Sequence, residues 1–101
     1  MKGVRETFSR YDTADYLKTE ADITAYLEAC AEEAPNDAGF MLKALGTVMR
    51  SRNVSQLAEA TGMTRAGLYK ALSGEGNPSL ANTMKVAKAL GYRLALVRDR
   101  D

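Results

Sequence analysis

The feature that most constrains the fold is a pair of short helical patterns, residues 56–61 and 65–72, on either side of Gly62. Glycine readily adopts the left-handed backbone that ends one helix and turns the chain toward the next. Thr64 can cap the second helix, because its hydroxyl can accept a hydrogen bond from an unpaired backbone N–H of the first turn. Ala58 is small where the second helix must approach the first. Together these residues predict a helix-turn-helix, a motif that places its second helix in the major groove of DNA.

Further helix starts and stops follow at regular intervals along the chain. Thr19 and Asp22 form a variant of the capping box, which predicts a helix from there until Pro35. Gly46 inside the next helical pattern predicts a close contact with another helix, because glycine otherwise weakens a helix. The other predicted caps are Asp12 or Thr13 for a short first helix, Asn36 for the helix with Gly46, Ser55 for the first helix of the motif, and Asn77, followed by Pro78, for a last helix that Gly91 ends.

These elements predict an all-α fold of five to six helices, and 101 residues suffice for one domain. Residues 1–11 show no clear period and are expected to be a flexible arm. Residues 12–35 are expected to form an acidic helical extension. Residues 36–98 are expected to form the helix-turn-helix DNA-binding domain together with a short C-terminal strand.

That strand is predicted for residues 92–98, where apolar side chains alternate with their neighbours in sequence. A single strand has no partner within such a chain, so it must pair with a second copy, pair with another protein, or remain unpaired. We predict a homodimer, with the two strands antiparallel about a twofold axis. The side chains expected at this contact are Tyr92, Leu94 and Leu96.

The residues that support much of enzyme chemistry are scarce: the chain has one cysteine, Cys30, and no histidine. This excludes a disulfide framework, a cysteine-based zinc site and any histidine-dependent triad. We expect no enzyme, no catalytic residue, no metal and no cofactor, and Cys30 is interpreted as a small core residue. The chain contains no run of about 18 apolar residues, so we expect no membrane-spanning helix. The first residues lack the apolar core of a secretion signal, so the cytoplasm is the expected location.

Charge is unevenly distributed along the chain. Residues 1–37 carry four basic and nine acidic residues, a net charge of −5, whereas residues 38–101 carry ten basic and four acidic residues, a net charge of +6. Such asymmetry suggests two different partners, although an ordinary solvated surface with accidental clustering is the alternative.

The outward face of the second motif helix supplies the candidate DNA contacts. Arg65 is the first candidate to read a base, since its guanidinium can bind guanine through two hydrogen bonds; a phosphate contact or a solvated arginine is the alternative. Lys70 can reach a base or a phosphate, and Tyr69 can contact DNA or fill a gap beside a neighbouring helix. Ala66 and Gly67 lack polar side chains, so base readout there is expected to be sparse. The full set of candidates is Ser55, Gln56, Thr64, Arg65, Ala66, Tyr69, Lys70, Ser73 and Asn77.

The chain resembles the phage-repressor (Xre, Cro-like) DNA-binding domains, and within them the addiction-module antidote proteins of HigA type. The resemblance implies an antitoxin that neutralises a small basic toxin of RelE/ParE type. It also implies that, as a dimer, the protein represses its own operon at an inverted repeat of double-stranded DNA. It covers roughly residues 11–98, and the segments that carry it are residues 11–18, 22–27, 55–58, 67–73 and 76–78.

The acidic residues of the N-terminal part, residues 12–37, have two interpretations. They form a docking surface for the basic toxin, or they are the solvent side of a helix pair that completes the core with Tyr16, Ile23, Tyr26 and Leu27. Two other functions stay open: a repressor without a toxin, and an interaction adaptor that kept the fold but not DNA binding. The candidate toxin-binding residues are Asp15, Glu20, Asp22, Glu28, Glu32 and Glu33.

Overall fold

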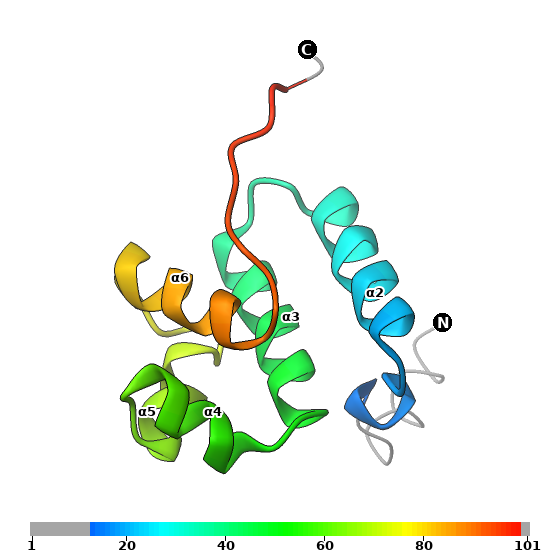
Figure 1. The fold of residues 1–101 in the computed structure, drawn as a ribbon. Coiled ribbons are helices and arrows are strands. Elements are labelled where there is room, and N and C mark those ends of the chain that lie inside the picture. Colours follow the sequence, from blue (N-terminus) through cyan, green and yellow to red (C-terminus); the bar gives the residue numbers. More distant parts are fainter. Residues whose placement is uncertain (1–12, 100–101) are drawn as a thin grey trace.

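The computed structural model of the chain describes residues 13–99, and these form helices without any strand. Figure 1 shows α3 at the centre, with α2 packed along one side of it and α4, α5 and α6 gathered on the other. The arm predicted for residues 1–11 lies outside the described residues. The elements are a 3-10 helix, η1 (Thr13–Tyr16), and the α-helices α2 (Glu20–Glu33), α3 (Ala38–Arg50), α4 (Val54–Thr61), α5 (Arg65–Ala71) and α6 (Leu80–Ala89).

The side-chain caps explain where these helices begin, and two of the predicted caps are confirmed. Thr19 accepts a hydrogen bond from the backbone N–H of Asp22, and the Asp22 carboxylate accepts one from the backbone N–H of Thr19, which completes the capping box of α2. Thr64 caps α5 by accepting from the N–H of Gly67 at 2.9 Å. Each bond satisfies a backbone donor that the helix itself leaves unpaired.

Three predicted caps are wrong, each by one or two residues. Asp37 rather than Asn36 caps α3, and Asn53 rather than Ser55 caps α4. Ser79 rather than Asn77 caps α6, accepting from the N–H of Asn82 at 3.0 Å. The physical reason is that several residues able to cap lie close together at these points, and the sequence pattern does not select among them. Because α4 begins at Val54, Ser55 lies inside its first turn and its hydroxyl is available for another contact.

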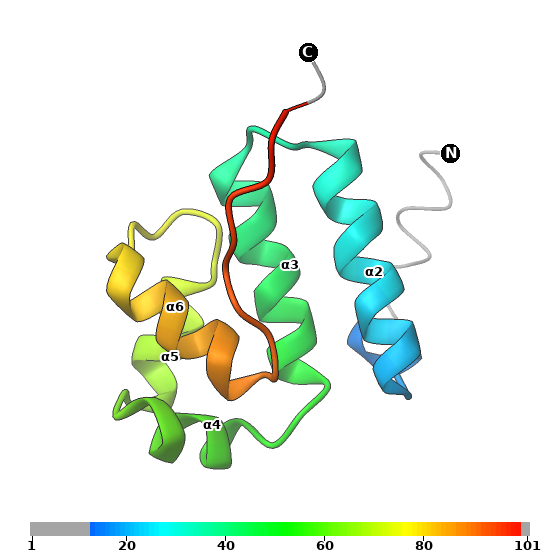
Figure 2. The ribbon, with the colours of Figure 1, turned by 45° about the horizontal axis from the view of Figure 1, so that its top comes forward.

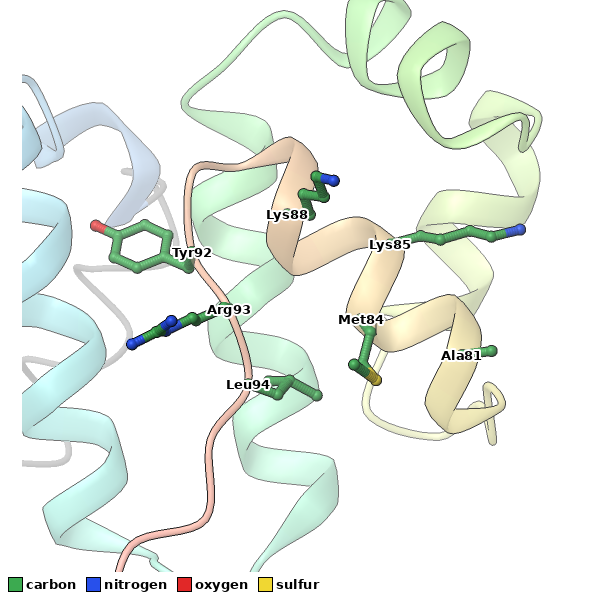
Figure 3. A pocket seen from close by; sticks show the side chains of 7 residues that line it. All are labelled: Ala81, Met84, Lys85, Lys88, Tyr92, Arg93 and Leu94. Carbon is green, nitrogen blue, oxygen red and sulfur yellow. The ribbon is translucent and has the colours of Figure 1, made fainter.

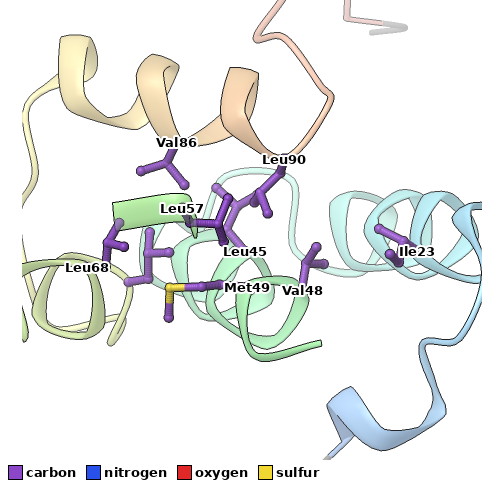
Figure 4. Packing of buried hydrophobic residues seen from close by; sticks show 9 residues of the cluster. Ile23, Leu45, Val48, Met49, Leu57, Leu68, Val86 and Leu90 are labelled. Atoms are coloured by element: carbon purple, nitrogen blue, oxygen red, sulfur yellow. The ribbon is translucent and has the colours of Figure 1, made fainter. Parts of the chain in front are cut away.

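One contiguous core joins the two halves of the fold (Figure 4). Leu68 of α5 and Val48 of α3 are both completely buried, and Met49 lies beside them. Ile23 reaches the same core from α2, on the opposite side of α3 from α5. Cys30 is also buried, as predicted. Of the four apolar residues expected to complete the core from the N-terminal part, Ile23 is buried and Tyr26 and Leu27 pack against the core, whereas Tyr16 is 62% exposed and does not contribute. Within residues 13–99 no helix is long and apolar enough to cross a membrane.

Two glycines have the conformational roles that the sequence predicts. Gly62 ends α4 with φ of 75°, the left-handed conformation expected for the turn into α5. Gly46 lies where α3 meets the end of α5: a Cβ atom there would be 2.8 Å from the carbonyl oxygen of Leu72, too close for any side chain. The close contact predicted at Gly46 is therefore confirmed, and it fixes the distance between α3 and α5.

The C-terminal strand predicted for residues 92–98 is not formed. Residues 92–99 are extended and lie between α2 and α6, across α3 (Figure 2). The reason is that a strand exists only as part of a ladder, and no other extended segment lies beside this one among residues 13–99. The segment is nevertheless anchored at its start, because the hydroxyl groups of Tyr92 and Thr24 of α2 are hydrogen-bonded at 2.8 Å.

Candidate functional site

The pair formed by α4 and α5 is held by a short, well-bonded connection. The N–H of Gly62 donates to the carbonyl of Ala58 at 2.9 Å, and the N–H of Met63 donates to the same carbonyl at 3.2 Å. The buried hydroxyl of Thr61 donates to the carbonyl of Leu57 at 2.8 Å and accepts from the N–H of Met63 at 3.3 Å. Since nearly every polar group of the turn is paired, α5 is presented in one fixed orientation relative to α4.

The structure places all the predicted DNA-contact residues at the surface. They come from the first turn of α4, from the outward side of α5 and from the loop that follows α5, while Leu68 on the inward side of α5 is buried. The exposed residues of this set are Ser55, Gln56, Thr64, Arg65, Ala66, Tyr69, Lys70, Ser73 and Asn77.

A direct contact joins the beginnings of the two helices. Arg65, the first residue of α5, donates a hydrogen bond from Nη1 to Oγ of Ser55 in the first turn of α4, at 3.2 Å. Ser55 is therefore the acceptor that orients this guanidinium rather than the cap of its own helix. An arginine held at one nitrogen keeps other N–H donors free for a partner, since the guanidinium carries five.

Two further residues of the set, Thr64 and Ser73, have local structural roles. Oγ1 of Thr64 is occupied by the cap, and a Cβ atom on Gly67 would lie 3.0 Å from that oxygen, tighter than an ordinary contact. Glycine at 67 thus leaves room for the cap, which explains why a position facing outward lacks a polar side chain. Ser73 donates to the carbonyl of Lys70 at 3.0 Å and accepts from the N–H of Glu75 at 3.2 Å. The hydroxyl groups of Thr64 and Ser73 therefore serve the backbone.

Tyr69 and Ser73 share a shallow cleft with α3. The cleft holds about 160 Å³, and Lys43 and Arg50 of α3 line it opposite the two α5-side residues. Arg50 donates from Nη2 to Oγ1 of Thr47 at 3.4 Å. Lys43 is not among the residues predicted from the sequence. Its spacing is the signal that could identify it, because residues 43, 47 and 50 fall on one face of a helix.

The acidic residues of the N-terminal part separate into two groups. Glu20 forms an ion pair with Arg52, with 2.7 Å between Oε2 and Nη2, and Asp22 caps α2. Arg52 is thus paired with the acidic part of the chain. All six members of the predicted set are exposed, and the four with neither of these roles are Asp15, Glu28, Glu32 and Glu33.

Asp22 makes the stability of the α2 cap depend on pH in the acid range. Backbone N–H groups of Lys18 and Thr19 donate to its carboxylate at 3.1 and 3.0 Å, and these bonds lower the pKa of Asp22 below its usual value of 3.8. Because the pKa of the folded state is the lower one, the stabilisation is complete well above pH 3.8 and disappears as the pH falls through the folded value.

We expect Asp22→Asn to destabilise the protein near neutral pH, because an amide supports the capping box less well than a carboxylate. The difference in stability between the two proteins should shrink as the pH falls from about 5 toward 2. Urea denaturation at a series of pH values measures this. Glu33→Gln, at the other end of α2, is the control, and a difference that stays constant with pH would contradict the capping role.

A second hollow lies beside α6, at the start of the C-terminal segment (Figure 3). It holds about 510 Å³ and is mostly apolar, with Met84 and Leu94 along it and Lys85 and Lys88 at its edge. Among the predicted dimerisation residues, Tyr92 is engaged within the chain through Thr24, whereas Leu94 and Leu96 are exposed. Within residues 13–99 no group of histidine, cysteine, aspartate or glutamate residues is arranged to hold a metal ion.

Comparison with known proteins connects this geometry with a family. The family described as "probable addiction module antidote protein" matches residues 7–98, which include every described helix. The chain belongs to this antidote family. A relative from Haemophilus influenzae, described as "uncharacterized protein", is 42% identical over 95 residues, covering 94% of this chain and 96% of the relative. No solved structure matches the chain.

Membership of the antidote family bears on what the charged surface of the chain can bind. An antidote acts against a toxin, so a partner protein is implied in general terms. The described surface of this antidote has an acidic region on η1 and α2 and a separate exposed face on α4 and α5. The two surfaces are contributed by different helices.

Proposed function

We propose that this chain is the antitoxin of a two-component toxin–antitoxin module in the cytoplasm. It binds and neutralises a small toxin of RelE/ParE type, and as a dimer it binds operator DNA and represses its own operon. The observation that carries the proposal is the match to the antidote family across residues 7–98. The exposed α4–α5 pair and the acidic α2 supply one surface for each of the two activities.

For DNA binding we propose that α5 is the recognition helix of a helix-turn-helix of Xre/Cro type. Its first turn and outward stripe, with Arg65, Tyr69 and Lys70, are exposed and enter the major groove. The first turn of α4 faces the phosphate backbone, where unpaired N–H groups and the amide of Gln56 can bind an anion. In a dimer the two α5 helices would read half-sites about 34 Å apart, or one helical turn, within an inverted repeat.

For toxin binding we propose the exposed acidic residues of η1 and α2. Glu28 and Glu32 are one helical turn apart on the outer side of α2, and Glu33 lies next to them. Opposite charge on a basic toxin would steer the two proteins together and favour the correct partner. Glu20 and Asp22 are not part of this contact, since the first pairs with Arg52 and the second caps α2.

The experiment that tests the proposal is co-expression with the product of the neighbouring small reading frame, which the proposal requires to encode a small basic protein. We expect that protein alone to arrest growth, and the pair to restore growth and to co-purify. If neither toxicity nor a complex is observed, the antitoxin function is wrong. Binding of the chain to its own upstream DNA would then leave a repressor without a toxin, and no binding would leave an adaptor.

A charge-reversal pair tests the toxin surface. We expect Glu28→Lys with Glu32→Lys to weaken the toxin complex by about tenfold or more, because attraction becomes repulsion across the interface. Glu59→Lys with Glu75→Lys makes the same change in net charge outside α2 and serves as the control. Isothermal titration of each variant with the toxin measures the effect. Equal losses in both variants would show that net charge, and not this surface, governs binding.

A further inference from the structure

Two glycines of α3 bring this helix into close contact with the end of α5 and with the loop that follows it. A Cβ atom on Gly39 would lie 2.8 Å from the carbonyl oxygen of Gly74, and one on Gly46 would lie 2.8 Å from that of Leu72. Residues 39 and 46 are about two helical turns apart, so they lie on one face of α3. Figure 2 shows the loop after α5 beside the first half of α3. The part of α3 between the two glycines is therefore held next to the end of α5.

Lys43 lies between these two contacts, and its side chain crosses the loop. A Cβ atom on Gly74 would overlap Cγ of Lys43 and would lie 2.6 Å from its Cδ. The aliphatic stem of Lys43 thus runs over the bare backbone of Gly74. Lys43 is exposed, and none of residues 13–99 pairs with its ammonium group through an ion pair or a hydrogen bond. A cation whose stem is already held loses less side-chain freedom when it binds an anion.

The cleft between α3 and α5 offers such an anion a place. Lys43 and Arg50 line its α3 side, Tyr69 and Ser73 line its α5 side, and none of the described residues that line it is acidic. Two cations without a carboxylate favour a negatively charged occupant. The cleft holds about 160 Å³, less than the roughly 300–1,000 Å³ of a small-molecule pocket, so it suits a single phosphate group carried by a larger partner.

The position of the cleft beside α5 indicates which phosphate it meets. Arg65, at the start of α5, is bonded to Ser55 of α4, whereas Tyr69, one turn further along, borders the cleft with α3. A helix with its side chains is about 10–12 Å across and the major groove is about 12 Å wide, so a helix that enters the groove fills it. The two sugar–phosphate backbones then lie against the residues that flank the helix. For α5 these flanks are the first turn of α4 and the α3–α5 cleft.

We propose that Lys43 binds a backbone phosphate of operator DNA at the α3–α5 cleft, with Arg50 adding positive charge from α3 on the same side. The inference rests on the DNA binding of the proposed function and deepens it, because it adds α3 to the surface that holds the duplex and names the residue that makes the contact. A phosphate contact carries no sequence information, so Lys43 fixes the position of α5 in the groove without selecting bases.

Removing the charge of Lys43 while keeping its stem tests this contact. We expect Lys43→Met to weaken binding to operator and to scrambled duplexes by the same factor, because a phosphate contact does not depend on the bases. The log–log slope of affinity against salt should fall by about 0.9, so the deficit should grow about 3.5-fold as salt is lowered from about 0.4 M to about 0.1 M. Fluorescence anisotropy measures both effects. Circular dichroism should show unchanged helix content, since Lys43 is exposed.

Two further variants separate a direct contact from a general effect of charge. Lys88→Met makes the same change on α6, outside the cleft, and should leave the slope nearly unchanged. Lys43→Arg keeps a cation at the cleft and should retain most of the slope. If Lys43→Met keeps the wild-type slope, or if Lys88→Met loses as much, the inference is wrong while the proposed DNA binding stands. If the wild-type protein binds neither duplex, the proposed DNA binding is wrong and the inference falls with it.

Ethylation interference locates the phosphate, because an ethylated phosphate has lost its negative charge. We expect one phosphate in each half-site at which ethylation weakens the wild-type protein but not Lys43→Met, since the variant no longer makes the contact there. Gln56→Ala, in the first turn of α4, is the matched comparison and should instead lose interference at a phosphate on the other side of the groove. Identical interference patterns for the wild type and Lys43→Met would overturn the proposal.

Discussion

Replacing Leu68 by alanine is expected to lower the free energy of unfolding by about 2–5 kcal/mol, the usual range for truncating a buried leucine. Leu68 has 0% of its surface exposed and lies in the central cluster with Val48, Met49 and Leu72. Gly46 already brings α3 and α5 into backbone contact, so the two helices cannot move closer together to fill the space left by the missing atoms. Urea denaturation followed by circular dichroism measures the loss.

The control for this variant is Lys70→Ala, two residues away on the exposed side of α5. It should change stability by no more than about 0.5 kcal/mol, as is usual for surface substitutions. A loss below 1 kcal/mol for Leu68→Ala would mean that α5 is not fixed by the core. Because Leu68 anchors the helix that carries Arg65 and Tyr69, the same variant should also bind operator DNA more weakly at temperatures where it is still folded.

Replacing Arg65 by alanine is expected to reduce discrimination between operator and unrelated DNA by about 5- to 150-fold, which corresponds to the 1–3 kcal/mol of a bidentate arginine–guanine contact. The structure gives this residue a defined starting position, since Ser55 accepts from Nη1 at 3.2 Å. Arg65→Lys should recover little of the loss, because an ammonium group does not form the two parallel bonds. Fluorescence anisotropy with operator and scrambled duplexes measures both affinities.

Lys70→Ala separates base reading from phosphate binding. We expect it to weaken operator and scrambled DNA alike and to reduce the salt dependence of binding by about 0.9 in the log–log slope, the effect of losing one phosphate contact. If Arg65→Ala also weakens both duplexes equally, Arg65 binds phosphate and the base-reading role is wrong. Ser55→Ala should then give a similar uniform effect, as it removes the acceptor that orients the guanidinium.

The features that could be predicted from sequence are those that depend on a few neighbouring residues. The turn at Gly62, the cap by Thr64 and the capping box of Thr19 and Asp22 are each determined within four residues, and all are present. A packing contact can also be predicted locally at Gly46. A glycine inside a helical pattern indicates that another helix packs closely there, although the pattern does not say which helix. The order of helices follows from these local signals.

What the sequence could not indicate depends on residues far apart in the chain. The pairing of Glu20 with Arg52 removes one candidate from the acidic surface and one basic residue from the DNA-binding side, and the two residues are 32 positions apart. Alternation alone predicts a dimer contact for Tyr92 and gives no sign that its hydroxyl is bonded to Thr24. The wrong caps have a different reason. Asp37 lies next to Asn36, and Asn53 lies two residues before Ser55, and these residues are equally able to cap.

The hydrogen bond between Thr24 and Tyr92 has a consequence for local unfolding. It joins residues 68 positions apart, and it holds α2 to the segment that follows α6. Regions that share such a contact open together, as one cooperative unit in amide hydrogen exchange. Helix α2 and the beginning of the C-terminal segment therefore gain and lose protection in concert, while α4 and α5 keep theirs through Leu57 and Leu68. Loss of the bond at Tyr92 is therefore expected to lower the protection of α2 while leaving that of α4 and α5 unchanged.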